Sequence, residues 1–200
     1  MENLSMIAAI GKNNELGKDN DLIWRLSGDM KFFRAMTNDK VIIMGRKTLE
    51  SLPNGRPLPN RVNIVLTKDE NYEVENAYVL NSIEEALDLI ALVDKECFVI
   101  GGASIYEEFM PYAENIYLTK IAATDPDADT YFPTFHPAEF YATEICRQAE
   151  NDIKYSLFKY TRKKEKEWKD CHSLNEKAEK LILSIIRKNR KRYEEMNKGL

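Results

Sequence analysis

Histidine and cysteine are scarce in this sequence. Its 200 residues include two histidines, His136 and His172, and three widely spaced cysteines, Cys97, Cys146 and Cys171. Nothing near the histidines has the spacing of metal ligands, so we expect no metal site. The odd number and wide spacing of the cysteines predict free thiols in a reducing compartment, which favours a cytoplasmic protein.

Long apolar runs are also missing. No stretch approaches the ~20 apolar residues that a helix needs to cross a bilayer, so we expect no membrane segment. Residues 1–4 have no basic region ahead of an apolar stretch, and they therefore do not resemble a signal peptide. Hydrophobic residues make up 44% of the chain and charged residues 31%, as in soluble globular proteins.

Charge is unevenly distributed along the chain, whose net charge is −4. Residues 163–200 hold 12 lysines and arginines against 7 acidic residues, a net charge of +5, so the rest of the chain carries −9. This change predicts an acidic domain over residues 1–162 and a basic tail over residues 163–200. The acidic domain would repel nucleic acid and anionic membranes, and we expect neither as a partner.

Short apolar, β-branched runs of strand length recur through the domain. Most are nearly continuous, which is typical of strands covered on both faces, as in a mostly parallel sheet flanked by helices. Two later stretches, 140–146 and 155–161, alternate more and predict an antiparallel hairpin at the sheet edge. The earlier runs are 6–10, 41–44, 62–66, 77–80, 98–100 and 116–122.

Helical segments lie between these runs. Ser27 can cap a helix that continues to Met36, and a capping box at residues 82–85 opens another helix. Residues 103–110 predict a short helix that stops before Pro111. The alternation of strands and helices indicates an α/β fold.

Asp29 falls in the first turn of the first predicted helix, among apolar neighbours. From the residues alone, the simpler interpretation is that Asp29 complements the helix dipole. The functional alternative is a carboxylate in an apolar cleft that meets a cationic or amidine-like edge of a ligand. Trp24 nearby is equally compatible with ordinary core packing.

Three strand ends carry residues suited to a nucleotide. Residues 45–48 run from a strand into a helix start with two cations, where backbone N–H groups bind phosphate, although solvated bases at a turn would look the same. Residues 66–68 offer a hydroxyl and a cation where open α/β sheets bind ligands. The pair Gly101-Gly102 permits close backbone approach, but it is not the GxGxxG fingerprint.

Taken together, these segments resemble dihydrofolate reductase over residues 4–162. The resemblance implies a mostly parallel eight-stranded sheet with four helices, and NADPH-dependent reduction of 7,8-dihydrofolate to 5,6,7,8-tetrahydrofolate in one-carbon metabolism. No single motif is decisive, but their order and spacing leave little room for chance. The matching features are Ile7-Ala8-Ala9, Gly17, Trp24, Asp29 with Phe33, Gly45-Arg46-Lys47-Thr48, Arg56 to Arg61, Ile100-Gly101-Gly102 with Tyr106, Thr119, and Asp129-Thr130 ahead of Phe132-Pro133.

The resemblance also implies a substrate site. Asp29 should hydrogen-bond the 2-amino group and N3 of the pterin, supported by Thr119, and Arg61 should bind the α-carboxylate of the glutamate tail. Residues 11–24, including the catalytic candidates Leu22 and Trp24, should be the mobile loop over the nicotinamide, steadied by Asp129. The remaining substrate contacts should come from Ile7, Ala9, Phe33, Leu52, Leu58, Ile100 and Tyr106.

Cofactor contacts follow in the same way, with a cis peptide expected between Gly101 and Gly102. Ser104 stands where the family often has arginine, so the preference for NADPH should rest on Arg46, Thr67 and Lys68. Ile23 replaces a usual proline, which would loosen the closing loop. The expected cofactor contacts are Ala9, Leu16, Asn20, Gly45, Arg46, Lys47, Thr48, Leu66, Thr67, Lys68, Gly101, Gly102, Ala103, Ser104, Ile105, Tyr106 and Thr130.

By this resemblance, hydride passes from nicotinamide C4 to pterin C6 while N5 is protonated. Asp29 would orient the pterin and raise the basicity of N5, with a water at the loop supplying the proton. Two rivals stay open. One is another reductase on the same scaffold, such as a riboflavin-pathway pyrimidine reductase, and the other is a non-catalytic binding protein whose basic tail is the active part.

The tail has a pattern of its own, for which the resemblance offers no guide. Residues 163–172 predict a charged linker, and 173–176 form a capping box. Apolar residues at helical spacing over 178–186 then predict an amphipathic helix. A helix of roughly 20 residues is hardly stable alone in water, so its apolar face needs a surface to pack against. That surface would be the chain's own domain, a second copy, or another partner.

Overall fold

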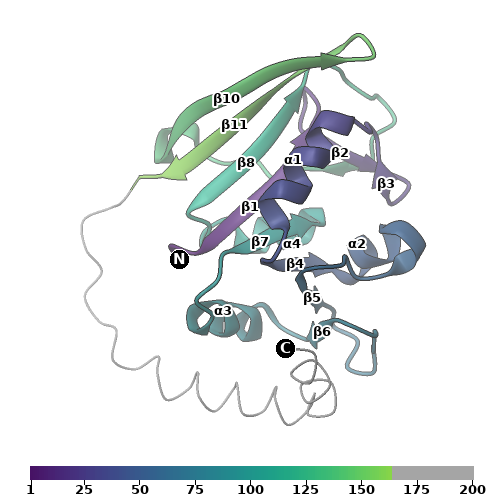
Figure 1. The fold of residues 1–200 in the computed structure, drawn as a ribbon, viewed down its shortest axis with the longest axis vertical. Helices are drawn as coiled ribbons and strands as arrows, with labels where there is room; N and C mark the ends of the chain where they lie inside the picture. Colours follow the sequence, from purple (N-terminus) through teal and green to yellow (C-terminus); the bar gives the residue numbers. More distant parts are fainter. Residues whose placement is uncertain (164–200) are drawn as a thin grey trace.

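An eight-stranded sheet forms the centre of the computed structural model, which describes residues 1–163 (Figure 1). Its strand order is β10-β11-β8-β1-β7-β4-β5-β6. The fold predicted from the sequence is therefore confirmed. The strands are β1 (Leu4–Ile10), β4 (Val41–Gly45), β5 (Val62–Leu66), β6 (Tyr78–Leu80), β7 (Cys97–Gly101), β8 (Asn115–Ile121), β10 (Phe140–Glu150) and β11 (Ile153–Arg162).

Six neighbouring strands pair in parallel, and β11 and β10 extend one edge of the sheet through antiparallel pairing. Strand β1 pairs in parallel with both β7 and β8, and β4 pairs in parallel with β7 and β5. Strand β11 is antiparallel to β8 and β10, which confirms the predicted edge hairpin. The hairpin turns at Asn151 and Asp152, whose φ angles of 49° and 64° are both positive, as in a type I′ turn.

Four helices cover the two faces of the sheet. The helices are α1 (Ser27–Thr37), α2 (Arg46–Ser51), α3 (Ile83–Leu92) and α4 (Ala103–Phe109). Apolar residues of α1 and α2 pack with Ile7 and Ile42 on one face, and those of α3 and α4 pack with Leu4 and Met6 on the other. Successive strand residues thus enter different cores, which explains the nearly continuous apolar runs.

A second, small sheet was not predicted from the sequence. It has the order β3-β2-β9, with β2 (Glu15–Lys18), β3 (Asp21–Leu22) and β9 (Thr130–Tyr131). The backbone N–H of Asp19 donates to Asp129 Oδ2 at 2.8 Å, and the N–H of Asp129 donates to the Gly17 carbonyl at 3.2 Å. The segment 11–24 is therefore tied to the connection after β8, and the expected contact with Asp129 is present.

One capping prediction is wrong, and a second is confirmed at the cap but differs in the partner of its glutamate. Ser27 is the first residue of α1 and not its cap; the N-cap is Leu26, and the Ser27 hydroxyl donates to Glu150 at 2.9 Å. In the predicted capping box, Ser82 Oγ does accept from the Glu85 N–H at 3.1 Å. The Glu85 carboxylate, however, accepts from the N–H of Asn81 at 2.9 Å, one residue before the cap.

The remaining elements and predictions concern the ends and the loops. Two short 3₁₀ turns, η1 (Pro53–Gly55) and η2 (Pro137–Glu139), precede β5 and β10. Cys97 and Cys146 are free thiols, as expected. Within residues 1–163, no helix is long and apolar enough to cross a membrane. The predicted linker and helix of the tail, and Cys171, lie outside the described residues.

Candidate functional site

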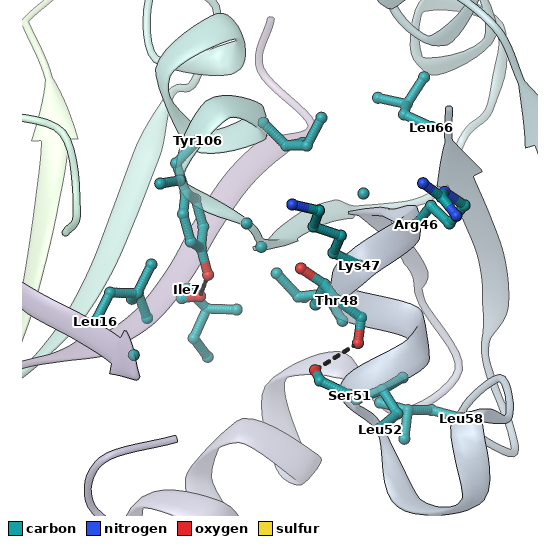
Figure 2. A pocket seen from close by; sticks show the side chains of 18 of the residues that line it. Ile7, Leu16, Arg46, Lys47, Thr48, Ser51, Leu52, Leu58, Leu66 and Tyr106 are labelled. Carbon is teal, nitrogen blue, oxygen red and sulfur yellow. Dashed lines mark hydrogen bonds between the residues drawn. The ribbon is translucent and has the colours of Figure 1, made fainter. Parts of the chain in front are cut away.

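A cleft of about 1230 Å³ opens where β1, β4, β5 and β7 reach their carboxyl ends. This is the edge at which open α/β sheets bind ligands. Every site residue expected from the sequence lines this cleft except Thr119, which lies on β8 and is 2% exposed. Figure 2 shows the cleft from close by, with Arg46 and Lys47 toward one end and Leu52 and Leu58 toward the other.

Asp29 is held in the cleft by the start of α1. Its Oδ1 accepts a hydrogen bond of 2.5 Å from Thr119 Oγ1, on the strand next to β1. Burial raises the pKa of Asp29 above its ordinary value, although the hydrogen bond from Thr119 acts in the opposite direction. A carboxylate in this position is incompletely solvated, so it favours a ligand that donates hydrogen bonds or carries positive charge.

The walls beside Asp29 are apolar. Leu52, Leu58, Phe33 and Ile100 pack against one core cluster around Ile7. All five side chains line the cleft. This slot suits a flat aromatic ring system whose polar edge reaches Asp29.

Tyr106 closes the inner wall of the cleft. Its hydroxyl donates to the Ile7 carbonyl at 2.7 Å (Figure 2). The centroid of its ring lies 4.9 Å from that of the Phe132 ring. Burial and the nearby Asp29 carboxylate both raise the pKa of Tyr106. Tyr106 is therefore a neutral, fixed side chain that shapes the cleft.

Arg61 is fixed at the other end of the apolar slot. Its Nε donates to Thr37 Oγ1 at 2.8 Å, and its Nη1 donates to the Pro59 carbonyl at 2.5 Å. Burial and the neighbouring Arg34 both lower the pKa of Arg61, but a guanidinium stays charged at neutral pH. Two like charges at one end of the cleft make that end suited to an anionic group.

The cationic end of the cleft is built on the start of α2. Gly45 is the N-cap of α2 and lines the cleft together with Arg46, Lys47 and Thr48, so the start of α2 lies at the cleft. Arg46 pairs with Glu50 at 3.3 Å and lies over the ring of Tyr72. Lys47 is exposed beside it. Backbone donors and cations together form an anion-binding site.

Two glycines allow the β7–α4 turn to approach α2 closely. Gly101 has a φ of +143°, and a Cβ added there would lie 3.1 Å from the Thr48 side chain. The Gly101–Gly102 peptide is cis, as expected. An extended ligand can therefore lie against this backbone, because no side chain projects from it.

The segment 11–24 reaches across the cleft. Asn20 Nδ2 donates to the Lys47 carbonyl at 3.1 Å, which links this segment to α2. Leu22 is 45% exposed and lines the cleft together with Trp24 and Leu16. The segment is thus placed where it can cover a bound ligand.

Sequence reasoning missed two asparagines that shape the site. Asn63 in β5 donates to the carbonyls of Leu58 and Arg61 at 2.9 and 3.1 Å and accepts from the Leu58 N–H. Asn81 Nδ2 donates to the Thr67 carbonyl at 2.9 Å and so supports the turn that carries Lys68. A buried asparagine inside an apolar strand was the available signal at position 63.

Metal binding has no support in the described part of the chain. Residues 1–163 contain no group of three histidine, cysteine, aspartate or glutamate side chains arranged to hold a metal ion. The cleft instead joins a half-buried carboxylate in an apolar slot to an end that is lined by the start of α2 and by cations. That arrangement fits an aromatic substrate beside a phosphate-bearing cofactor.

Comparisons with known proteins agree on one family. The sequence model of the dihydrofolate reductase family matches residues 3–162. A dihydrofolate reductase of Bacillus subtilis is 39% identical over 163 residues, covering 80% of this chain and 95% of that protein. A second, from Staphylococcus haemolyticus, is 42% identical over 130 residues, covering 65% and 76%. The solved dihydrofolate reductase of Enterococcus faecalis, complexed with NADP(H) and RAB-propyl, is 31% identical with a TM-score of 0.72, covering 80% of this chain and 96% of that one.

Proposed function

The chain belongs to the dihydrofolate reductase family, and we propose that the cleft around Asp29 is where it binds and reduces its substrate. The enzyme is an NADPH-dependent oxidoreductase that converts 7,8-dihydrofolate to 5,6,7,8-tetrahydrofolate. The observation that carries the assignment to the cleft is the Asp29 carboxylate. It is partly buried in an apolar slot and bound to Thr119 at 2.5 Å.

The pterin edge complements this carboxylate. Its 2-amino group and N3 present two adjacent donors, which match the two oxygens of one carboxylate. Phe33, Ile100 and Leu58 would enclose the ring system and its benzoyl neighbour. Arg61, with Arg34 beside it, would bind the glutamate carboxylate, because both place positive charge at that end of the slot.

The protein's part in the reaction is to orient and polarise the pterin. NADPH, when bound, supplies the hydride that reaches C6 of the pterin. Asp29 binds the edge of the pterin that lies across the ring system from N5, so it fixes the ring and raises the basicity of N5 electrostatically. The proton then comes from water beside Leu22. The segment 11–24 excludes bulk water from the rings.

The cationic end of the cleft would hold the cofactor. The N–H groups of α2 with Arg46, Lys47 and Thr48 suit the pyrophosphate side, and Gly101 and Gly102 permit close approach of the cofactor to the backbone. The 2′-phosphate of NADPH would meet Thr67, Lys68 and Arg46. The preference for NADPH then rests on these side chains, because Ser104 is uncharged.

An absorbance assay of NADPH oxidation tests the function. Turnover should require both NADPH and dihydrofolate, and the pyrimidine substrate of the riboflavin pathway should not replace dihydrofolate. Oxidation with the pyrimidine alone would favour the related reductase. A folded protein without activity on either substrate would favour a binding protein.

The tail and the location of the protein are separate proposals. Residues 1–162 would be the catalytic domain and 163–200 a basic appendage in a cytoplasmic protein. The appendage would contact its own acidic domain or a second copy, because opposite charges attract. Deleting residues 170–200 should leave turnover nearly unchanged and alter the melting temperature or oligomeric size. A folded truncation without activity would place the tail in the active site.

A further inference from the structure

Helix α1, which carries Asp29, begins without a capping side chain of its own. Its N-cap is Leu26, whose aliphatic side chain cannot accept a hydrogen bond. The first N–H groups of a helix need acceptors, and leaving them without partners costs stability. The acceptor here comes from far along the chain, at the end of the edge hairpin.

Glu150 supplies that acceptor. The backbone N–H of Ser27 donates to Glu150 Oε1 at 2.9 Å, and the N–H of Gly28 donates to Oε2 at 3.2 Å. The Ser27 hydroxyl also donates to Oε2, at 2.9 Å. These hydrogen bonds hold the pKa of Glu150 below its ordinary value, so Glu150 is an anion at neutral pH. A negative charge at a helix N-terminus is stabilising.

The hairpin also contacts the first turn of α1 through Gly28. Tyr155 donates its hydroxyl hydrogen to Gln148 Oε1 at 2.7 Å, and both side chains lie against Gly28. A Cβ added to Gly28 would be 2.2 Å from the Tyr155 hydroxyl and 2.6 Å from Gln148 Oε1. Gly28 directly precedes Asp29, so the hairpin touches the backbone that carries the carboxylate.

Glu150 is held in place by the β10–β11 hairpin. It is the last residue of β10, and the tight turn at Asn151 and Asp152 leads directly into β11. Strand β11 pairs with β8, which carries Thr119. The first turn of α1 is therefore held from two sides by one continuous set of strands, by Glu150 at its backbone and by Thr119 at Asp29.

We infer that Glu150 is a positioning residue for the reduction: it fixes the first turn of α1 so that Asp29 meets Thr119 and the pterin edge. This inference rests on the proposed role of Asp29. It extends the functional site to the tip of the β10–β11 hairpin, which does not line the cleft.

Single-turnover hydride transfer at neutral pH tests this role. Glu150→Ala should lower the rate constant by about tenfold and raise KM for dihydrofolate, because small displacements of a binding group are costly. The Kd for NADPH should not change. Glu150→Gln should recover part of the rate, since its single amide oxygen can replace one of the two accepting carboxylate oxygens. Glu144→Gln is the matched control: Glu144 lies on the same strand, pairs with Arg147, and should behave as wild type.

A double-mutant cycle separates positioning from general destabilisation. In the Asp29→Asn background, Glu150→Ala should lower the rate by less than about twofold, because the group that it positions is already gone. If Glu150→Ala lowered the rate by the same factor in the Asp29→Asn background as in wild type, the inference would be overturned. If Asp29→Asn alone had wild-type turnover, the proposed role of Asp29 would fail instead.

Gly28→Ala provides a second route if Glu150→Ala does not fold. The new methyl group would overlap the ends of the Tyr155 and Gln148 side chains, so these ends must shift and the packing of the hairpin on the first turn of α1 must change, while Glu150 stays intact. Gly28→Ala should lower the rate constant of hydride transfer in the wild-type background and hardly change it in the Asp29→Asn background. Wild-type rates in a folded Gly28→Ala protein would show that the hairpin does not position Asp29.

Discussion

The two ends of the cleft that we assign to substrate and cofactor would recognise these ligands by different physics. At the substrate end, one carboxylate sits in an apolar slot with a raised pKa and a buried threonine behind it. At the cofactor end, the polar groups are backbone N–H groups and cations near solvent; the side chain of Arg46 is 42% exposed. The first arrangement concentrates interaction energy in one residue, and the second spreads it over many.

This difference predicts how each end responds to change. A charge that is largely shielded from water interacts strongly with a bound ligand, because little water screens it. Removing the Asp29 carboxylate should therefore lower activity severely, and the loss should depend on pH. Each exposed cation contributes less to the binding free energy, and salt screens its attraction to the ligand. Substitutions at the two ends should therefore differ in size, in pH dependence and in salt dependence.

The largest effect should follow from Asp29→Asn. Hydride transfer to dihydrofolate should fall by about 100-fold or more at neutral pH, because Asn cannot polarise the pterin as an anion does. Activity should recover partly at low pH, where substrate is already protonated. A pH profile of single-turnover rates measures both effects. Wild-type turnover at neutral pH would remove Asp29 from the mechanism. The substrate end of the cleft would then be no more sensitive to substitution than the cofactor end.

A smaller effect is expected for Arg61→Leu, at the far end of the substrate slot. Dihydrofolate binding should weaken by about 2 kcal/mol, the cost of a lost charge-assisted partner. Titration calorimetry with a folate analogue that lacks the glutamate is the control, and it should give equal affinities for both proteins. If the analogue is weakened as much as dihydrofolate, Arg61 acts on the slot itself and not on the carboxylate.

At the cofactor end, the combined replacement of Arg46 and Lys68 by alanine should be milder. The Kd for NADPH should rise about tenfold at low salt and less at high salt, and the Kd for NADH should rise much less, because NADH shares the pyrophosphate near Arg46 but lacks the 2′-phosphate. Replacing Lys95 and Lys154, which are exposed and lie outside the cleft, gives the same change in net charge as a control. Equal losses for both cofactors would contradict recognition of the 2′-phosphate by these side chains.

The large sheet was predictable because its strands carry a strong signal. Strands buried on both faces are nearly continuous apolar runs, and residues 62–66 match β5 in full. Strand β10 was predicted only to residue 146, since the bulge between Glu144 and Cys146 and the polar residues after it break the alternation. The small sheet was missed because β3 and β9 have two residues each, too few to show a period.

The site was predictable only as far as its residues lie in recognisable motifs. The strand-end positions of Arg46, Lys68 and Gly101 follow from local patterns. The pairing of Asp29 with Thr119 joins residues 90 positions apart, and only the family resemblance suggested it. Ser27 was wrongly predicted as a cap because its partner Glu150 lies 123 positions away, and no local rule locates such an acceptor.

The smallest effect concerns stability, and it has the opposite sign to the effect on activity. Burial raises the pKa of Asp29, so the folded protein keeps the Asp29 proton to higher pH than the unfolded chain does. As pH rises from the ordinary aspartate range through the folded pKa, stability is lost, and the penalty persists at neutral pH. Asp29→Asn removes this penalty and still accepts from Thr119.

The melting temperature of Asp29→Asn at neutral pH should therefore exceed that of wild type by about 3 °C, for a gain on the order of 1 kcal/mol. The gain should vanish below the ordinary aspartate pKa, where wild type is also neutral at this position. Asp21→Asn is the control, because Asp21 is exposed, pairs with Arg25 at 2.7 Å and has a lowered pKa. It should give no gain at any pH. A lower melting temperature for Asp29→Asn at all pH values would mean that the carboxylate stabilises the fold, and the stability cost that we assign to its burial would then be absent.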